Sequence, residues 1–165
     1  METLHMALGT DSYDILLQRG LLAQAGTLLN LDRKVLVVTD SGVPAQYAAQ
    51  LAAQCTQPVL VTVPQGEGAK SFDGLQTLLG AMLKAGFHRS DCVVAVGGGV
   101  VGDLAGFAAA TYMRGVDFYN IPTTSLSQVD SSIGGKTAIN FNGVKNIVGA
   151  FYQPRKVLED PDLLA

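Results

Sequence analysis

Tryptophan is absent from this sequence of 165 residues, and cysteine, histidine and charged residues are scarce. Asp, Glu, Lys and Arg make up only 15% of the chain, below the roughly one quarter that is usual in globular proteins. The two cysteines, Cys55 and Cys92, are too few for a disulfide framework, and each lies in or beside an apolar run. We therefore expect both thiols to be reduced and buried.

The two histidines, His5 and His88, give little support to metal chemistry. Neither has a second His, Cys or Glu at the spacing that metal ligands require, so no metal site is expected in this chain. The sequence also lacks the G-x-S-x-G segment that would support a Ser-His-Asp triad.

Long hydrophobic runs are missing as well. No stretch approaches the roughly 18 apolar residues of a membrane span, and the first residues do not combine a basic segment with an apolar one, as a signal peptide does. The net charge of −3 argues against non-specific binding of nucleic acid. We expect a soluble, cytoplasmic protein that binds neither nucleic acid nor membrane.

The composition that is present indicates a folded protein. Hydrophobic residues make up 48% of the chain, which excludes disorder. At about 150 residues per domain, the length predicts one domain over residues 1–165. The low charge also suggests that part of the surface is covered by a partner or a second domain.

Short β-branched runs alternate with segments of helical spacing along most of the chain. Strands are expected over 34–39, 58–63, 91–96 and 116–121, and helices over 44–54, between an N-cap at Ser71 and a stop at Gly86, and over 99–109. The strands are continuous apolar runs, typical of strands buried on both faces of a parallel sheet. We thus predict an α/β, Rossmann-like parallel sheet with helices on both faces.

The two ends of the chain are harder to interpret. Residues 4–8 and 13–17 are expected to pair as an edge hairpin, and residues 21–29 to form a helix. Residues 123–132 are expected to form a helix, whereas 134–151 is a segment rich in Gly, Asn and Lys with no element assigned.

The segment Gly97–Asp103 (GGGVVGD) is the sharpest local motif. Gly97, Gly99 and Gly102 satisfy G-x-G-x-x-G between a predicted strand and a predicted helix. Such glycines let the backbone approach a diphosphate, which the N-terminus of the helix attracts. The loop follows an internal strand, however, and no acidic residue closes the next strand. The alternative is that the glycines only form a tight turn.

A second glycine segment, Gly134–Thr137 (GGKT), resembles the end of a phosphate-binding loop. The full pattern needs glycine at position 130, where this chain has Asp130, so it is not a Walker A motif. Lys136 and Lys145 lie among amide side chains, a combination that suits a phosphorylated or polyhydroxylated ligand. The alternative is that both are ordinary solvated lysines.

Charged side chains also follow two of the predicted strands. Asp40 ends the first of these strands, and Glu67 and Lys70 follow the second. Ligands bind at the carboxyl ends of the strands in parallel sheets, so the shared position favours a site. Taken singly, each residue is equally well explained as a cap or a solvated charge.

Taken together, the motifs resemble the 3-dehydroquinate synthase family. The resemblance rests on Pro122–Asn140 (PTTSLSQVDSSIGGKTAIN), Gly143–Asn146, Gly149–Pro154, Pro64–Ser71 and Gly97–Asp103, and it extends from about residue 34 to the end of the chain. The wider superfamily of sugar-phosphate cyclases and polyol dehydrogenases shares the glycine loop. Within that superfamily, the segment from Asp130 to Lys136 resembles the dehydroquinate branch.

The resemblance implies a fold, a cofactor and a reaction. The fold is a Rossmann-like domain followed by a helical, metal-binding domain, with NAD held between them. The reaction converts 3-deoxy-D-arabino-heptulosonate 7-phosphate, a small phosphorylated sugar acid, to 3-dehydroquinate and phosphate in the shikimate pathway. Transient oxidation of a substrate alcohol permits phosphate elimination, and the hydride then returns, so NAD is not consumed.

The resemblance also implies roles for individual residues. The expected cofactor contacts are Asp40, Gln65, Gly66, Glu67 and Lys70 on the adenosine side, Gly98, Gly99, Val100, Val101, Gly102 and Asp103 at the diphosphate and ribose, and Thr123, Thr124 and Leu126 along the nicotinamide. The expected catalytic residues are Asp130, Lys136, Lys145 and Asn146, which face the substrate and nicotinamide, and Arg114, which reaches the phosphate pocket of the other subunit of a homodimer. Lys136 and Lys145 count among the cofactor contacts too.

Length is the main departure from the family pattern, with Ala138, where many members have Gly, a minor one. Family members continue into a domain that carries the ligands of a zinc or cobalt ion, and we expect this chain to be the N-terminal half of such an enzyme. Without the metal that polarises the substrate hydroxyl, the chain alone is expected to be inactive. The alternatives are a non-catalytic NAD-binding module that acts through a partner chain, and a polyol dehydrogenase of the same superfamily.

Overall fold

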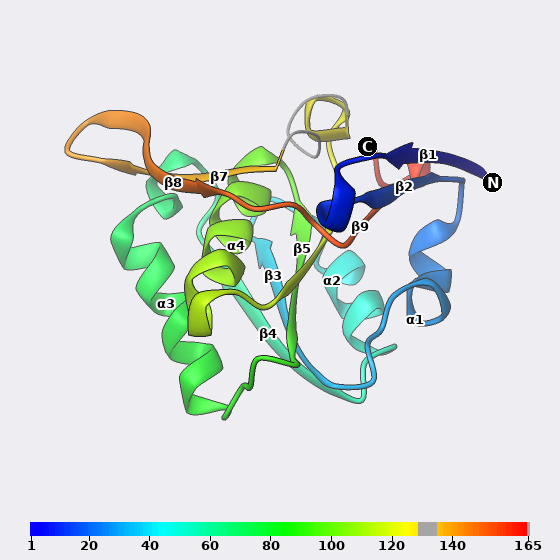
Figure 1. Ribbon diagram of the computed structural model, residues 1–165, viewed down its shortest axis with the longest axis horizontal. Helices are drawn as coiled ribbons and strands as arrows, with labels where there is room; N and C mark the ends of the chain where they lie inside the picture. The colour runs from blue at the N-terminus through cyan, green and yellow to red at the C-terminus, as the bar shows by residue number, and fades with distance from the viewer. Residues whose placement is uncertain (129–134, 165) are drawn as a thin grey trace.

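A computed structural model describes residues 1–128 and 135–164 and shows a twisted sheet with helices on both faces (Figure 1). The seven strands lie in the order β1-β2-β9-β6-β5-β3-β4 and are parallel except for β1. The strands are β1 (Glu2–Met6), β2 (Tyr13–Leu17), β3 (Lys34–Asp40), β4 (Gln57–Val63), β5 (Cys92–Gly97), β6 (Asp117–Pro122) and β9 (Lys156–Glu159). The predicted α/β fold is confirmed.

Four complete α-helices and five short 3₁₀ segments occur among the described residues, besides the helical residues 125–128. The helices are α1 (Ala25–Leu28), α2 (Ala45–Ala52), α3 (Phe72–Lys84) and α4 (Gly99–Thr111), and the 3₁₀ segments are η1 (Gly9–Asp11), η2 (Leu21–Gln24), η3 (Glu67–Ala69), η4 (Tyr112–Arg114) and η6 (Pro161–Leu163). None of these helices is long and apolar enough to span a lipid bilayer.

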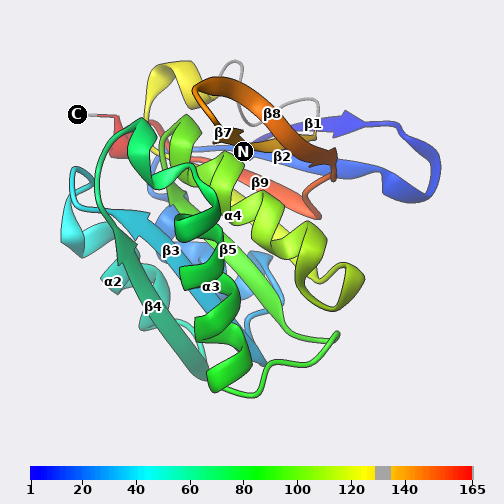
Figure 2. The same cartoon turned by 90° about the vertical axis from the view of Figure 1, so that its left-hand side faces the viewer.

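The apolar runs of the central strands are continuous because alternate side chains enter two different cores. Leu36 and Val38 of β3 pack beneath α3 and α4, whereas Val35 and Val37 of the same strand pack beneath α1 and α2. Figure 2 shows α3 and α4 side by side on one face of the sheet. Helix α3 begins and ends as predicted, because the Ser71 hydroxyl accepts the Gly74 N–H at 3.1 Å and Gly86 adopts a φ of 73°.

Strand β4 corrects one prediction. Residues 58–63 are not a buried strand, because β4 is the edge of the sheet and Leu60 is 49% exposed. At the N-terminus the predicted edge hairpin is confirmed, with its first strand two residues earlier than expected. The predicted helix over 21–29 is split into the short segments η2 and α1. The predicted helix over 123–132 is helical at 125–128, and its remainder lies outside the described residues.

Residues 136–151 form an antiparallel hairpin that the sequence analysis did not predict. Its strands are β7 (Lys136–Phe141) and β8 (Val144–Phe151). Strand β7 packs against α4 (Figure 2). The turn is Asn142-Gly143, with φ values of 50° and 77°. Positive φ at both positions is what a type I′ turn requires, so this dipeptide is the signal that predicts the hairpin.

The two thiols differ in their surroundings. Cys92 is fully buried in β5, as expected, and burial raises its pKa to about 12. Cys55 is only half-buried, and burial raises its pKa to about 11. Both thiols are therefore protonated at neutral pH and poor nucleophiles.

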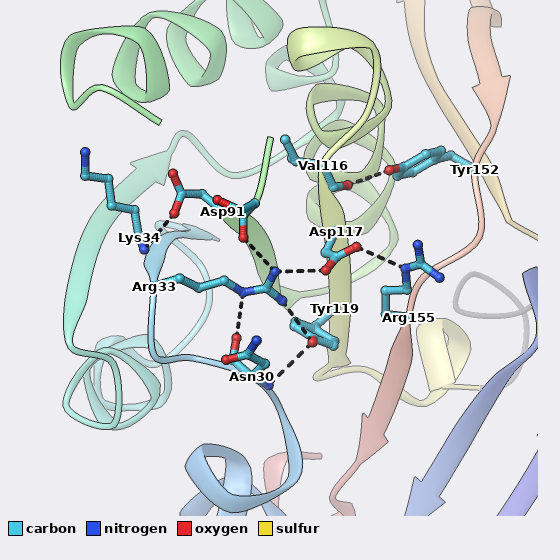
Figure 3. Close-up of polar contacts among 10 residues, drawn as sticks. Asn30, Arg33, Lys34, Asp91, Val116, Asp117, Tyr119, Tyr152 and Arg155 are labelled. Atoms are coloured by element: carbon cyan, nitrogen blue, oxygen red, sulfur yellow. Dashed lines mark hydrogen bonds and ion pairs between the residues drawn. The ribbon is translucent and has the colours of Figure 1, made fainter. Parts of the chain in front are cut away.

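A polar network ties the amino ends of the strands together (Figure 3). The Arg33 guanidinium donates to Asp117 at 2.8 Å, to the Tyr119 hydroxyl at 3.0 Å and to the Asn30 carbonyl at 2.8 Å, and Arg155 donates to the other oxygen of Asp117 at 3.0 Å. Burial by itself raises the pKa of Asp117. The hydrogen bonds and charges of the two arginines outweigh burial, so the pKa lies below its usual value.

Replacing Asp117 by asparagine is expected to lower the free energy of unfolding by about 1–2 kcal/mol at pH 7, because both arginines lose a charged acceptor. A carboxyl whose pKa is lowered by folding stabilises the chain above its unfolded pKa of about 3.9 and loses that effect as the pH falls further. The difference between the wild type and Asp117→Asn in urea unfolding is therefore expected to shrink from pH 7 to pH 3. An equal difference at both pH values contradicts the assignment.

Candidate functional site

The strand order places a topological switch point at β3. The chain leaves β3 toward β4 through α2, whereas β5, which follows α3, lies on the other side of β3. Helices α2 and α3 accordingly pack on opposite faces of the sheet. The loops after β3 and β5 therefore diverge, and ligands bind in such a crevice in open α/β sheets.

A cavity of about 230 Å³ lies at this crevice. Its lining comes from the loops that follow β3, β4, β5 and β6 and from η6, and consists of Asp40, Gly42, Val43, Pro44, Gln65, Gly98, Thr123, Thr124 and Leu163. The predicted positions of Asp40 and Gly98 at the carboxyl edge of the sheet are confirmed. Gly42, Val43, Pro44 and Leu163 were not predicted, although the first three follow directly on the strand that ends in Asp40.

Gly97 and Gly98 of the Gly97–Asp103 segment differ in what surrounds them. Gly97 ends β5, and a Cβ there would lie only 2.7 Å from a methyl group of Val101, so tight packing requires this glycine. Gly98 lines the cavity, and a Cβ there would be in ordinary contact with the Thr124 methyl group at 3.4 Å. The tight-turn interpretation therefore explains Gly97 but not Gly98.

Helix α4 starts at the cavity with its first N–H groups available. Gly98 is its N-cap, and no side chain in the described ranges caps this end of the helix. The helix has 13 residues, enough for a developed dipole, and an uncapped N-terminus attracts anions. These donors fit the diphosphate of a dinucleotide.

A buried ion pair lies beside this N-terminus. The Lys70 ammonium contacts the Asp103 carboxylate at 2.7 Å. Lys70 directly follows η3, and Asp103 lies in the first turns of α4. Lys70 is only 4% exposed. Burial raises the pKa of Asp103, although the hydrogen bond and charge of Lys70 oppose the rise. The pair fixes the Glu67–Lys70 loop against α4.

Asp40 fits both interpretations of its role. One of its carboxylate oxygens accepts the N–H groups of Gly42 at 2.8 Å and Val43 at 3.1 Å, so it caps its own turn. The same side chain lines the cavity, where a carboxylate suits the hydroxyl groups of a ribose.

Gly66, Thr123 and Thr124 lie at the same edge of the sheet, whereas Val101, also a predicted cofactor contact, is fully buried in α4. The Thr123 N–H donates to the Gly97 carbonyl at 2.9 Å, and the Thr124 and Ser127 hydroxyls are 2.7 Å apart. Leu126 is 67% exposed. Gly66 precedes η3 with a φ of 107°.

The predicted catalytic residues are not gathered at one point. Lys136 begins β7, whereas Lys145 and Asn146 lie opposite Asn140, near the turn at the other end of the hairpin and roughly 13 Å away along the strand. Arg114 lies beyond the last residue of α4, about 20 Å from Gly98 along the helix. Asp130 lies outside the described residues.

The described side chains do not fit a metal ion. No group of three or more His, Cys, Asp or Glu residues is close enough to hold one within residues 1–128 and 135–164.

Comparison with known proteins connects this geometry to a family. The family model described as "3-dehydroquinate synthase N-terminal" matches residues 60–165. The 3-dehydroquinate synthase of Caulobacter vibrioides is 49% identical over all of this chain and 47% of its own length. That of Latilactobacillus sakei is 47% identical over 99% of this chain and 48% of its own length. The chain thus spans about half the length of these curated relatives.

Solved structures show the same fold in related cyclases. A 2-deoxy-scyllo-inosose synthase with carbaglucose-6-phosphate, NAD⁺ and Co²⁺ superposes with a TM-score of 0.91 at 28% identity, covering 99% of this chain and 47% of that one. The 2-epi-5-epi-valiolone synthase of Streptomyces hygroscopicus, with NAD⁺ and Zn²⁺ bound, gives 0.84 at 34% identity, covering 96% of this chain and 45% of that one. The family match spans more than half of the chain, so this protein belongs to the 3-dehydroquinate synthase family.

Proposed function

We propose that this chain is the NAD-binding half of a 3-dehydroquinate synthase, which converts 3-deoxy-D-arabino-heptulosonate 7-phosphate to 3-dehydroquinate and phosphate. The observation that carries the proposal is the cavity at the switch point, where none of the described side chains caps α4 at Gly98. The names of the relatives and the NAD⁺ bound by two neighbours support it.

Each part of the dinucleotide has a matching part of the edge of the sheet. Asp40 and the Glu67–Lys70 loop bind the adenosine, the N–H groups after Gly98 bind the diphosphate, and Thr123 and Thr124 adjoin the nicotinamide. Bound NAD supplies a reversible acceptor for the hydride of a substrate alcohol. The chain binds and orients it, and the buried Lys70–Asp103 pair keeps the loop in place.

The substrate is a small anion, and the exposed cations of this chain suit it. Lys136 and Lys145 are exposed ammonium groups that bind phosphate or carboxylate as point charges, with Asn146 as an amide partner. Asp130 completes this group in the proposal. Arg114 projects from the far end of α4 and serves the phosphate pocket of the second subunit of a homodimer.

The complete enzyme includes more than residues 1–165, which form one domain in this proposal. A second, helical domain supplies the ligands of a zinc or cobalt ion, since the described residues do not. The enzyme acts in the cytoplasm.

A variant at Gly98 tests the proposed site. Gly98→Asp puts a carboxylate at the N-cap of α4, where Asp is favoured, and its φ of −83° is open to any residue. We expect unchanged or higher stability, and an affinity for NAD⁺ at least about tenfold weaker in calorimetry, a change of about 1.4 kcal/mol. Equal NAD⁺ binding by both proteins contradicts the site.

The activity of the isolated chain separates the possible roles. With NAD⁺ and added zinc or cobalt, no 3-dehydroquinate is expected to form, because the Lewis acid has no ligands among the described residues. Turnover by the pure chain contradicts the proposal that a second domain supplies the metal ligands. Micromolar binding of NAD⁺ without turnover favours a non-catalytic NAD-binding module. A chain that forms only one side of the NAD cleft is expected to bind NAD⁺ more weakly.

A further inference from the structure

Asn140, to which the proposed function gives no role, connects the two parts of the chain that carry the proposed site residues. Its backbone N–H donates to the Lys70 carbonyl at 2.9 Å, and its side-chain N–H donates to the Glu67 carboxylate at 3.3 Å. Its side-chain oxygen accepts the N–H of Asn146 at 3.0 Å. One residue thus joins the loop after β4 to the returning strand of the hairpin.

The hairpin is irregular at this point. Ile139 pairs with Val148 and Phe141 with Val144, so Asn140 alone lies opposite Lys145, Asn146 and Ile147. Two additional residues on one strand form a bulge, which changes the direction of the side chains it contains. Asn146 has a φ of 57°, a left-handed conformation that the hydrogen bond from its N–H to Asn140 supports.

The loop side of the connection is held by several contacts. Lys70 accepts the backbone N–H of Asn140 and holds Asp103 of α4 through its buried ammonium. Phe72, two residues after Lys70, and Phe141, next to Asn140, make an edge-to-face contact with ring centroids 5.2 Å apart. A continuous series of contacts therefore runs from α4 through Lys70 and Asn140 to the bulge.

The side-chain amide of Asn140 meets two partners at once. The Glu67 carboxylate accepts from the side-chain N–H of Asn140, and the Asn146 N–H donates to its side-chain oxygen, so asparagine supplies one donor and one acceptor. Aspartate would keep the acceptor but would set a second carboxylate against Glu67, and alanine would remove both groups.

We propose that Asn140 is a positioning residue, which holds the bulge with Lys145 and Asn146 in a set place against the Glu67–Lys70 loop and so couples NAD binding at that loop to the substrate-facing lysine. This inference rests on the proposed function for the ligand. The hydrogen bonds that it needs are present without one.

Amide hydrogen exchange and NAD⁺ titration, both followed by NMR on the full chain, test the inference. In Asn140→Ala the Asn146 N–H is expected to exchange on the order of tenfold faster, since its acceptor is lost. On addition of NAD⁺, the shift change at Asn146 is expected to fall to less than about a third of its wild-type value, while that at Gly98 persists. A merely structural role would not separate these two signals.

Matched variants distinguish the specific contacts from general loosening of the hairpin. Asn140→Asp is expected to reduce the NAD⁺ response at Asn146, because it sets a second carboxylate against Glu67. Asn142→Gly, in the same hairpin at a φ of 50°, is expected to behave as the wild type. Unchanged exchange at Asn146 in Asn140→Ala, or an unaltered NAD⁺ response in either Asn140 variant, overturns the inference. If NAD⁺ shifts no signal of the wild type, both the proposed function and the coupling of NAD binding to the bulge are contradicted. Hydrogen exchange at the Asn146 N–H still decides whether Asn140 positions the bulge.

Discussion

Replacing Lys70 by methionine is expected to lower the free energy of unfolding by about 3 kcal/mol at pH 7, because the largely buried Asp103 carboxylate loses its partner. Removing one member of a buried pair has a typical effect of about 3–5 kcal/mol. We expect the lower end of that range, because the side chain of Asp103 keeps 23% exposure to water. Urea unfolding of the two proteins measures the difference.

The pH dependence of this variant has a definite sign. Burial already raises the pKa of Asp103 in the folded chain, and without Lys70 that pKa rises further. A carboxyl whose pKa is raised by folding lowers the free energy of unfolding as the pH rises above the unfolded pKa of about 3.9. The deficit of Lys70→Met is therefore expected to be smaller at pH 5 than at pH 7.

Two further variants control this experiment. Lys84→Met removes an exposed lysine in the last turn of α3 and is expected to change stability by less than about 1 kcal/mol. Asp103→Asn combined with Lys70→Met is expected to regain part of the loss, because no unpaired charge remains buried. If Lys70→Met and Lys84→Met are equally stable, the pair does not hold the loop.

Two glycines of the same helix are expected to respond to alanine with opposite signs. A Cβ at Gly74, in the first turn of α3, would lie 1.9 Å from the backbone oxygen of Ala69. The helix or the Glu67–Lys70 loop must then move, and we expect Gly74→Ala to destabilise the chain by about 2–3 kcal/mol. A Cβ at Gly80 would meet no atom within 4 Å, so Gly80→Ala is expected to stabilise the chain by about 0.5–1 kcal/mol.

This pair of variants also links the loop to the proposed site. Thermal unfolding measures the two stabilities, and calorimetry with NAD⁺ measures the effect of moving the loop. We expect Gly74→Ala to bind NAD⁺ more weakly and Gly80→Ala to bind it as the wild type does. Changes of the same sign at both positions contradict the close approach of Gly74 to Ala69.

The predicted strands that proved correct share one physical property. Residues 34–40 and 92–97 are buried on both faces of the sheet, so an uninterrupted apolar run is enough to identify them. The same kind of run over 57–63 is an exposed edge strand. Its position depends on the direction in which the chain crosses the sheet after α2, which composition does not express.

Other elements carried too weak a local signal. Strand β9 has only four residues, and its burial depends on β2 and β6 closing around it. The hairpin of β7 and β8 had a readable turn, Asn142-Gly143, but its strands contain lysine, asparagine and glycine rather than a clear alternation. Helices α1 and η2 are single turns that exist because Leu21, Leu22 and Ala25 pack into the core.

The sequence by itself determined the family, the parallel α/β sheet and the edge at which we propose that a ligand binds. These follow from local patterns, since the carboxyl ends of parallel strands share one edge and a glycine loop after a strand marks it. Tertiary structure decided how the charges and amides are used. Lys70 is buried against Asp103, and Asn140 meets a carboxylate 73 residues away in the chain, because two crossovers bring the loop after β4 under the hairpin. Pairings between residues so distant in sequence depend on the packing of whole elements, and no local pattern of residues encodes them.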